Sequence, residues 1–230
     1  MTLLVAVAAW FADAAHYQGP DAVQVRILEH VELSAVAVLV AIALALPAGL
    51  LLGHSGRFAF VAVSIANVGR ALPSLALLAL ALLVVLPLGL GLGFWPTVLA
   101  LIPLAIPPIL TNSYVGVRNV DRDVIEAARG MGLGEMEILR RIEVPLAIPL
   151  IVAGVRTAAV NVVATATLGA IVASGGLGRY IVDGFALRED DRLFAGALLV
   201  AALAIAVETS LGLLERAAVS PGIRQRAVRL

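Results

Sequence analysis

The 230-residue sequence contains no cysteine, and all sixteen of its basic residues are arginine. Without cysteine the chain can form neither a disulfide framework nor a thiol-based site. The arginine bias, together with the many alanine, valine, leucine and glycine residues, is typical of a GC-rich genome rather than of a mechanism. Charge is also scarce, because charged residues make up 14% of the chain against about 25% in soluble domains.

Sequence features of enzymes and of nucleic-acid-binding proteins are absent as well. The chain has no G-x-x-x-x-G-K-[ST] phosphate loop, and its His, Asp and Ser residues form no recognisable catalytic cluster in the sequence. No basic stripe with interleaved aromatic residues supports nucleic-acid binding. We therefore expect a chain that is not an enzyme and that has no catalytic residue, metal or cofactor of its own.

The sequence is rich in long runs of apolar residues. Hydrophobic residues make up 61% of the chain, and its mean hydropathy is +1.04. Residues 33–53 and 71–117 carry no charged side chain, and uncharged runs of about 18 residues or more are typical of transmembrane helices. We therefore predict an all-α membrane protein with five spans, at residues 31–53, 73–88, 97–117, 146–172 and 193–214.

The segments around these spans divide the chain into three parts. Residues 1–30 are expected to lie at the membrane interface, with Trp10 and Tyr17 near the lipid headgroups. Residues 31–216 form the transmembrane domain, in which residues 58–70 are expected to lie along the interface as a further helix. Residues 217–230 form a cytoplasmic tail.

The arginine residues predict the orientation, because short loops rich in basic residues stay in the cytoplasm. Five spans place eleven arginines on one side of the membrane and four on the other. The larger set is Arg57, Arg70, Arg118, Arg122, Arg129, Arg140, Arg141, Arg216, Arg224, Arg226 and Arg229, and the smaller set is Arg26, Arg179, Arg188 and Arg192. We therefore expect the C-terminus in the cytoplasm and the N-terminus outside.

One charged segment, residues 121–145, interrupts the apolar chain between the third and fourth predicted spans. Charge runs are usually solvated faces, but this one also has apolar residues at roughly helical spacing. They are Ile125, Ala128, Met131, Leu133, Met136, Leu139 and Ile142. Asp121 or Asp123 is placed to cap a first helix, and the glycines around Gly132 break the pattern before a second one. The segment is predicted to form two short amphipathic helices around a glycine corner, suited to a groove in another protein.

The charged segment also resembles a known family motif. Its residues read EAA, three residues, G, nine residues, then I-x-V-P, which are Glu126, Ala127, Ala128, Gly132, Ile142, Val144 and Pro145. This pattern is similar to the EAA motif of ABC importer permeases and departs from it only in Val144, where the family has Leu. Residues 69–81, 110–121 and 167–181 look like parts of the permease subunits of osmoprotectant importers. The resemblance covers nearly the whole chain from about residue 25.

The resemblance implies a fold, a mechanism and partners. The fold is the five-span core of type I ABC importer permeases, also seen in methionine permeases. The charged segment would be the coupling helix, seated in a cleft of a separate ATPase subunit that binds ATP and Mg²⁺. A second permease subunit, identical or homologous, would complete the pathway, and an extracytoplasmic binding protein would deliver the solute. The chain is then expected in a bacterial cytoplasmic membrane.

The resemblance also implies a substrate class, namely glycine betaine, carnitine, choline or proline betaine. Quaternary ammonium groups are usually held by aromatic cages, and the eleven aromatic residues of this chain do not cluster in the sequence. Substrate choice is therefore expected to lie in the binding protein. A permease for methionine or another small nutrient is the nearest alternative, although residues 72–80 and 167–178 favour osmoprotectants. An ATPase-independent channel or carrier is a further alternative, without a visible filter or carboxylate relay.

Two charged residues, Arg156 and Glu208, fall well inside predicted spans, away from the span ends. A lone charge at the centre of a bilayer costs about 2.5–3.5 kcal/mol on insertion scales. The two residues lie at similar depths, about 10 Å from the cytoplasmic side at 1.5 Å per residue. They are therefore candidates for an ion pair, unless each extends separately to the interface.

Polar residues near the end of the fourth predicted span are candidates for lining the transport pathway. They are Asn161, Thr165 and Thr167. The alternative is that they bond to neighbouring helices or to their own backbone. Beyond them Gly175, Gly176 and Gly178 predict an external turn, which either receives the binding protein or is purely structural.

Overall fold

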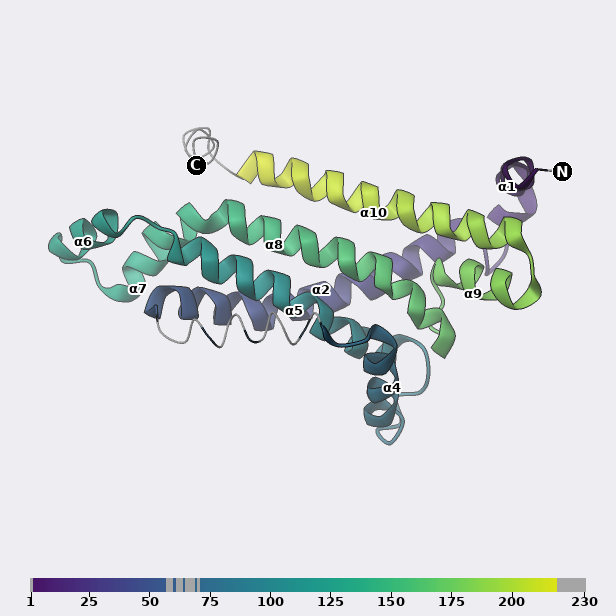
Figure 1. The fold of residues 1–230 in the computed structure, drawn as a ribbon, viewed down its shortest axis with the longest axis horizontal. Coiled ribbons are helices and arrows are strands. Elements are labelled where there is room, and N and C mark those ends of the chain that lie inside the picture. The colour runs from purple at the N-terminus through teal and green to yellow at the C-terminus, as the bar shows by residue number, and fades with distance from the viewer. Residues whose placement is uncertain (1, 57–59, 61–63, 65–68, 70, 219–230) are drawn as a thin grey trace. The chain divides into compact units, whose positions relative to one another are not determined.

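The computed structural model describes residues 2–56, 60, 64, 69 and 71–218, and all regular structure within these residues is helical (Figure 1). In chain order the elements are α1 (Leu3–Ala12), η1 (Ala14–Tyr17), α2 (Val23–Ser55), α4 (Ser74–Val85), α5 (Phe94–Arg118), α6 (Arg122–Gly130), α7 (Glu135–Ile138), η2 (Leu139–Glu143), α8 (Val144–Thr165), η3 (Ala166–Val172), α9 (Gly178–Leu187) and α10 (Asp190–Ala218). Most of the predicted interface helix at 58–70 lies outside the described residues, as do Arg57, Arg70, Arg224, Arg226 and Arg229.

Four helical stretches of the described chain are long and apolar enough to cross a membrane. They are Val23–Ser55, Phe94–Arg118, Glu135–Val172 and Asp190–Arg216. The second predicted span, residues 73–88, is represented by α4, which contains only 12 residues. At 1.5 Å per residue α4 extends about 18 Å, against a hydrocarbon core of about 30 Å. Four of the five predicted spans are therefore long enough on their own, and α4 is not.

The first long helix begins at Val23, not at residue 31 as predicted. The polar residues that suggested a boundary are satisfied inside the fold. The Glu29 carboxylate accepts the Gly176 backbone N–H at 2.7 Å, and His30 is completely buried. These side chains have protein partners, and residues 23–30 form the first two turns of α2.

The fourth predicted span also begins earlier than expected. The chain is helical from Glu135 onward, and Pro145 lies in the first turn of α8, which begins at Val144. Just before the proline, residues Leu139–Glu143 form a π-helical turn in which the Val144 N–H donates to the Leu139 carbonyl. Proline has no N–H to donate, and its ring crowds the carbonyl four residues back. The wider π turn accommodates this proline without a break in the helix.

The chain forms two compact units. Unit 1 consists of Met1–Leu39, Leu72–Leu104 and Ala159–Val207. One of its apolar clusters joins α1, α2, α9 and α10, and includes Trp10, Val23, Leu177, Tyr180, Ala195 and Val200. A second cluster in unit 1 packs α4 against the beginning of α5 and the end of η3, and includes Leu77, Leu78, Ala81, Ala100 and Val172.

Unit 2 consists of Val40–Ala71, Ala105–Ala158 and Glu208–Leu230. Within it α2 packs closely on α5 through the sequence GLLLG, in which Gly49 and Gly53 are four residues apart. A Cβ atom at Gly53 would lie 2.8 Å from the Tyr114 carbonyl oxygen, and one at Gly49 would lie 2.7 Å from that of Leu110. Small residues at this spacing allow helix backbones to approach each other, which is a main source of helix association in lipid.

Candidate functional site

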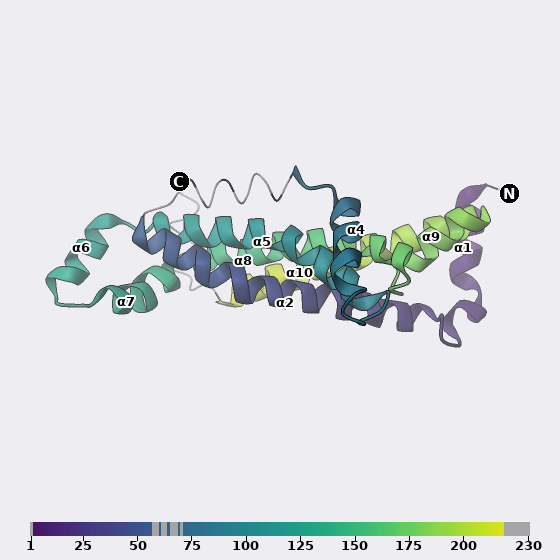
Figure 2. The same ribbon diagram turned by 90° about the horizontal axis from the view of Figure 1, so that it is seen from below.

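The charged segment, residues 121–145, forms the predicted helical hairpin. In both views of unit 2, α6 and α7 lie beside each other beyond the end of α5 (Figure 1, Figure 2). The Asp121 carboxylate caps α6 by accepting the Asp123 backbone N–H at 3.0 Å, as one of the two predicted caps. The inner face of the hairpin packs into a small core of its own, formed by Ile125, Ala128 and Ile138.

The corner of the hairpin depends on Gly132. Its φ angle is +86°, in the left-handed region where residues other than glycine are strained. Around it the Gly132 N–H donates to the Arg129 carbonyl at 2.9 Å, and the Leu133 N–H donates to the Ala128 carbonyl at 3.2 Å. These bonds satisfy the carbonyls at the end of α6.

Arg129 and Glu135 close the corner from the outside. Arg129 donates from Nε to Glu135 Oε1 at 2.7 Å and from Nη2 to Oε2 at 2.9 Å. This paired hydrogen bond and the attraction of the carboxylate raise the pKa of Arg129. The two side chains are half-exposed, so the pair contributes more to the geometry of the corner than to stability.

The residues of the motif divide between the inside and the outside of the hairpin. Ala128 is 1% exposed, and Ile142 packs against it in the hairpin core. Val144 packs against Val117, Leu139, Ala147 and Ile151 in a second cluster of unit 2. Pro145 is half-buried at the start of α8, whereas Glu126 and Ala127 are exposed, as is Met131 at the corner. The hairpin thus keeps one face for its own core and presents another face outward.

Sequence reasoning missed one residue at the base of this hairpin, His54. It lies at the end of α2, 89 residues before Glu143, and its Nδ1–H donates to Glu143 Oε2 at 2.6 Å. The His54 Nε2 lies 3.3 Å from Glu135 Oε2. A single histidine at the end of an apolar helix gives no sequence signal, because both of its partners are distant in the chain.

A polar cavity of about 240 Å³ opens beside His54 in unit 2. Its ionisable lining residues are His54, Arg118, Arg122, Glu126, Arg129 and Glu143. Glu143 is 6% exposed, so a carboxylate is buried at the foot of the hairpin, next to a space lined by three guanidinium groups.

The two predicted intramembrane charges lie close together in unit 2. Arg156 Nε is 3.3 Å from Glu208 Oε1, and Arg156 Nη1 is 3.1 Å from Glu215 Oε2. Glu215 was not considered in the sequence-based pairing because it lies at the end of the last predicted span. One guanidinium therefore faces two carboxylates.

The three candidates for the pathway lining have different surroundings. Asn161 is exposed in the single chain. Thr165 borders a cavity of about 10 Å³ together with Thr97 and Gly169, which is too small for a solute. Thr167 donates its hydroxyl to the Ala164 carbonyl at 2.9 Å, the backbone bond that the sequence left open as an alternative.

The glycine turn that follows is tied to α2 within unit 1. Gly175 and Gly176 have φ angles of +75° and +72°. The Leu177 N–H donates to His30 Nδ1 at 3.3 Å, so His30 Nε2–H donates in turn to the Val163 carbonyl at 2.8 Å. The turn thus has a structural role, whatever else contacts it.

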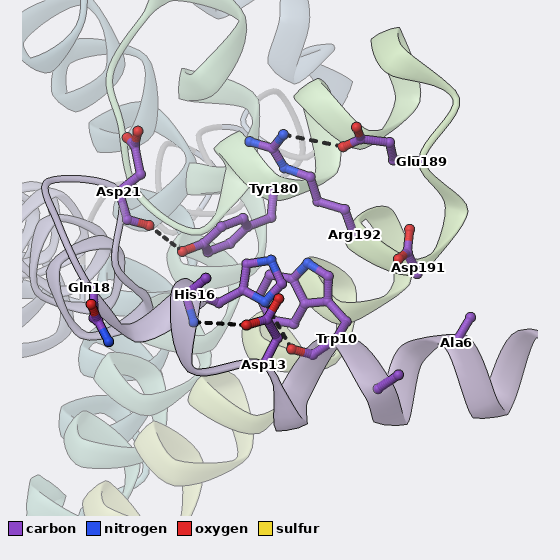
Figure 3. Close-up of a pocket in the computed structure, with 12 residues that line it drawn as sticks. Ala6, Trp10, Asp13, His16, Gln18, Asp21, Tyr180, Glu189, Asp191 and Arg192 are labelled. Atoms are coloured by element: carbon purple, nitrogen blue, oxygen red, sulfur yellow. Dashed lines mark hydrogen bonds and ion pairs between the residues drawn. The ribbon is translucent and has the colours of Figure 1, made fainter.

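A cavity of about 650 Å³ in unit 1 gathers aromatic and acidic side chains (Figure 3). The aromatic residues are scattered in the sequence, but the fold brings two of them together here, because Trp10 and Tyr180 meet edge to face with ring centroids 5.3 Å apart. His16 stacks on Trp10 at 4.0 Å. The Tyr180 hydroxyl donates to the Asp21 carbonyl at 2.5 Å, and burial raises the pKa of Tyr180.

Three of the four acids that line this cavity have local partners. Asp13 accepts the Ala15 N–H, Asp21 pairs with Arg26, and Glu189 pairs with Arg192. Trp10 and Tyr180 are 5% and 4% exposed, so their faces are covered by each other and by neighbouring side chains. The described residues include no group of three His, Asp or Glu side chains suited to a metal ion. These contacts pack α1 against α9 and α10.

Comparison with known proteins places this architecture in a family. Residues 37–220 match the family described as "Binding-protein-dependent transport system inner membrane component". The chain is 38% identical over 201 residues to the carnitine transport permease protein OpuCB of Listeria monocytogenes, covering 87% of this chain and 90% of that protein. It is 36% identical to the choline transport system permease protein OpuBB of Bacillus subtilis, covering 86% and 88%.

Two further matches extend the comparison. The osmoprotectant import permease protein OsmW of Salmonella typhimurium is 31% identical over 214 residues, covering 92% of this chain and 100% of that protein. A solved structure of the MetNI methionine ABC transporter in an inward-facing conformation aligns with a TM-score of 0.74 at 22% identity, over 84% of this chain and 94% of that one. At this identity the likeness shows the fold. The chain therefore belongs to the family of binding-protein-dependent transport system inner membrane components, and it is a permease subunit of an ABC importer.

Proposed function

We propose that this chain is the transmembrane subunit of an ATP-driven importer of osmoprotectants in a bacterial cytoplasmic membrane. Its solute is glycine betaine, carnitine, choline or proline betaine. It works with a separate ATPase subunit, which holds the ATP and Mg²⁺, and with a second permease subunit, identical or homologous. An extracytoplasmic binding protein delivers the solute, and the chain itself hydrolyses nothing.

The substrate class rests on the full-length similarity to named permeases. Relatives that are 31–38% identical over at least 81% of this chain are named for carnitine, choline, glycine betaine or osmoprotectants. The methionine transporter matches at 22% identity, which supports the shared fold only. A permease for methionine or another small nutrient therefore remains the second candidate, and the uptake experiment below also measures methionine.

The coupling role rests on one observation, the construction of the α6–α7 hairpin. Its inner residues Ala128 and Ile138 are buried in a core of its own, so it holds its shape without a partner. Its outer residues Glu126, Ala127 and Met131 are exposed. A polar, self-supporting hairpin with an apolar methionine at its tip fits a groove on a soluble subunit. An ATPase-independent channel or carrier has no use for such a hairpin.

Uptake measurements test this function directly. Deletion of the gene is expected to abolish ATP-dependent uptake of at least one labelled solute among glycine betaine, carnitine and choline, and its return on a plasmid is expected to restore uptake. Affinity purification of the tagged chain is expected to bring an ABC ATPase with it. Unchanged uptake of all three solutes, with loss of methionine uptake, would transfer the assignment to the second candidate.

The proposed topology has five spans, with the N-terminus outside and the hairpin in the cytoplasm. It requires α4, with the residues around it, to cross the membrane although α4 contains only 12 residues. Because the chain has no cysteine, single cysteines can be introduced without background. A cysteine at Met131 is expected to react with a membrane-impermeant maleimide only from the cytoplasmic side, and one at Leu187 only from outside.

The polar residues of the fourth span complete the proposal. Asn161, exposed in the single chain, is proposed to face a pathway formed with the second permease subunit. Thr165 and Thr167 are proposed to lie along the same pathway. Replacing Asn161 by Ala is expected to raise the KM for uptake with little change in the amount of assembled importer, which immunoblotting of the membrane fraction measures.

A further inference from the structure

His54 is the centre of a chain of charged groups that joins α2 to three parts of the hairpin. It donates to Glu143 of the π turn at 2.6 Å and lies 3.3 Å from Glu135 of α7. Glu135 in turn accepts two hydrogen bonds from Arg129 of α6. We call these four residues, Arg129, Glu135, Glu143 and His54, the His54 network. All four lie in unit 2.

Burial makes the contact between His54 and Glu143 demanding. The side chains of His54 and Glu143 are 15% and 7% exposed. A buried carboxylate without a partner is strongly destabilising, and its donor must be well placed. The Nδ1–H of His54 supplies this donor to Glu143 at 2.6 Å. The contact between α2 and the π turn is therefore buried, whereas the pair formed by Arg129 and Glu135 is half-exposed.

The helix end alone does not explain this arrangement. A histidine in the last turn of a helix interacts favourably with the helix dipole wherever it points. His54 instead places its two ring nitrogens against carboxylates from two different elements, α7 and the π turn. Without the network, the hairpin is joined to the rest of unit 2 through its two chain connections and through an apolar cluster in which Leu139 and Val144 pack with Leu46 and Leu50 of α2. The network adds a polar connection to α2, made by His54 at the end of that helix.

We propose that His54 is a positioning residue for transport, which fixes the hairpin to α2 so that movement of the hairpin reaches that helix. The inference rests on the proposed coupling function of residues 121–145. It adds that the force is passed on to α2 through His54 and Glu143, as well as along the chain into α8. The π turn, which contains Glu143 and precedes Pro145, is the element that His54 holds in place.

The first arm of the test measures position without any transport. Cysteines at Leu51 and Met131, which are 52% and 74% exposed, carry spin labels in the otherwise cysteine-free chain. Pulsed EPR on the assembled importer, with labelled subunits diluted by unlabelled ones, reads the distance between α2 and the corner. The distribution is expected to be narrow in the parent and to broaden in His54→Ala. His54→Arg is expected to keep it narrow, because the cavity beside His54 has about 240 Å³ of space and a guanidinium can reach both carboxylates.

The second arm measures coupling in proteoliposomes that contain the complete importer and its binding protein. In His54→Ala the solute transported per ATP hydrolysed is expected to fall by roughly tenfold, and in His54→Arg most of it is expected to return. His16→Ala is the matched control, since His16 lies in η1 of unit 1, where its ring donates to the Trp10 carbonyl at 2.9 Å and stacks on the Trp10 ring. This control is expected to leave both measurements unchanged.

The outcomes separate this inference from the proposed function. A distance distribution that stays narrow in His54→Ala overturns the inference, and so does a broadened one with an unchanged transport ratio. Neither result touches the coupling role of the hairpin. If the parent importer shows no ATP-dependent uptake, the proposed function fails, and the role of His54 in transport fails with it. Broadening together with a lower ratio, both reversed by His54→Arg, supports the inference.

Discussion

Arg156 of α8 holds Glu208 of α10 at 3.3 Å, and the same guanidinium lies 3.1 Å from Glu215. Glu208 and Glu215 are seven residues apart, which is about two helical turns, so Arg156 sits between them along one face of α10. The three charges therefore form a polar connection between α8 and α10 within unit 2.

Replacing Arg156 is expected to be more damaging than replacing either glutamate. Arg156→Ala leaves two carboxylates without a cation, at an expected cost of about 2–3 kcal/mol. Glu208→Gln or Glu215→Gln leaves Arg156 one partner and is expected to cost about 1 kcal/mol or less. Thermal unfolding of the purified permease in detergent measures the order. Equal losses for all three variants would show that the groups do not act as one cluster.

A simple exchange of charges is expected to fail for the same reason. In the double variant Arg156→Glu with Glu208→Arg, the carboxylate introduced on α8 faces the unchanged Glu215. Rescue is expected instead from Arg156→Ala combined with Glu208→Gln and Glu215→Gln, which removes every charge. If the exchanged pair alone restored full stability, Glu215 would have no share in the interaction.

Gly132 is expected to be sensitive to backbone conformation and not to size. A Cβ atom at this position would meet nothing within 4 Å, but the φ angle is +86°. A left-handed conformation costs residues other than glycine about 1–2 kcal/mol, and asparagine and aspartate less. Uptake is therefore expected to fall more in Gly132→Ala than in Gly132→Asn, although alanine is smaller, and to fall most in Gly132→Val.

Gly130→Ala is the matched control for this series. Gly130 is helical, and a Cβ atom there also meets nothing within 4 Å, so the change adds the same methyl group without strain. Uptake in Gly130→Ala is expected to equal that of the parent at equal amounts in the membrane. A ranking of the Gly132 variants by side-chain volume alone would contradict the conformational explanation.

The hairpin and the His54 network show how far the sequence could predict this molecule. The hairpin was predictable because its signals are local, with a capping Asp121, periodic apolar residues and Gly132 within one short segment. The contact of His54 with Glu143 was not, because it joins residues 89 apart that have no shared pattern. The start of α2 was predicted wrongly for a related reason. Glu29 suggested a helix boundary, but its partner is the Gly176 backbone N–H, 147 residues away in the chain.

His30 is expected to be replaceable only by a side chain that both donates and accepts. It accepts the Leu177 N–H and donates to the Val163 carbonyl while completely buried. His30→Leu leaves both backbone groups without a partner, at an expected cost of about 1–3 kcal/mol. His30→Gln carries a donor and an acceptor and is expected to lose less. Thermal unfolding in detergent separates the two, and a Leu variant as stable as the Gln variant would mean that packing alone matters here.

Gly53 is expected to set the distance between α2 and α5 in unit 2. A Cβ atom there would lie 2.8 Å from the Tyr114 carbonyl oxygen and 2.8 Å from the Val117 Cβ. Because one of these atoms belongs to a helix backbone, the helices must separate to admit even a methyl group. Gly53→Ala is therefore expected to cost about 1–3 kcal/mol, and Gly53→Val more. The measurement is the thermal unfolding midpoint in detergent, together with the amount of folded permease after size-exclusion chromatography.

The control for Gly53 adds volume to the same helix where there is room. Ala43 of α2 is exposed in the single chain, so Ala43→Val adds bulk without forcing α2 from α5 and is expected to leave the midpoint unchanged. Valine is a poorer helix former than alanine but a better one than glycine. Helix propensity can therefore explain a small loss in Ala43→Val but not a loss in Gly53→Val. Gly53→Ala is the sharpest test, because alanine is the best helix former. A stabilised Gly53→Ala variant would therefore contradict the close approach of the two helices, and a destabilised one supports it.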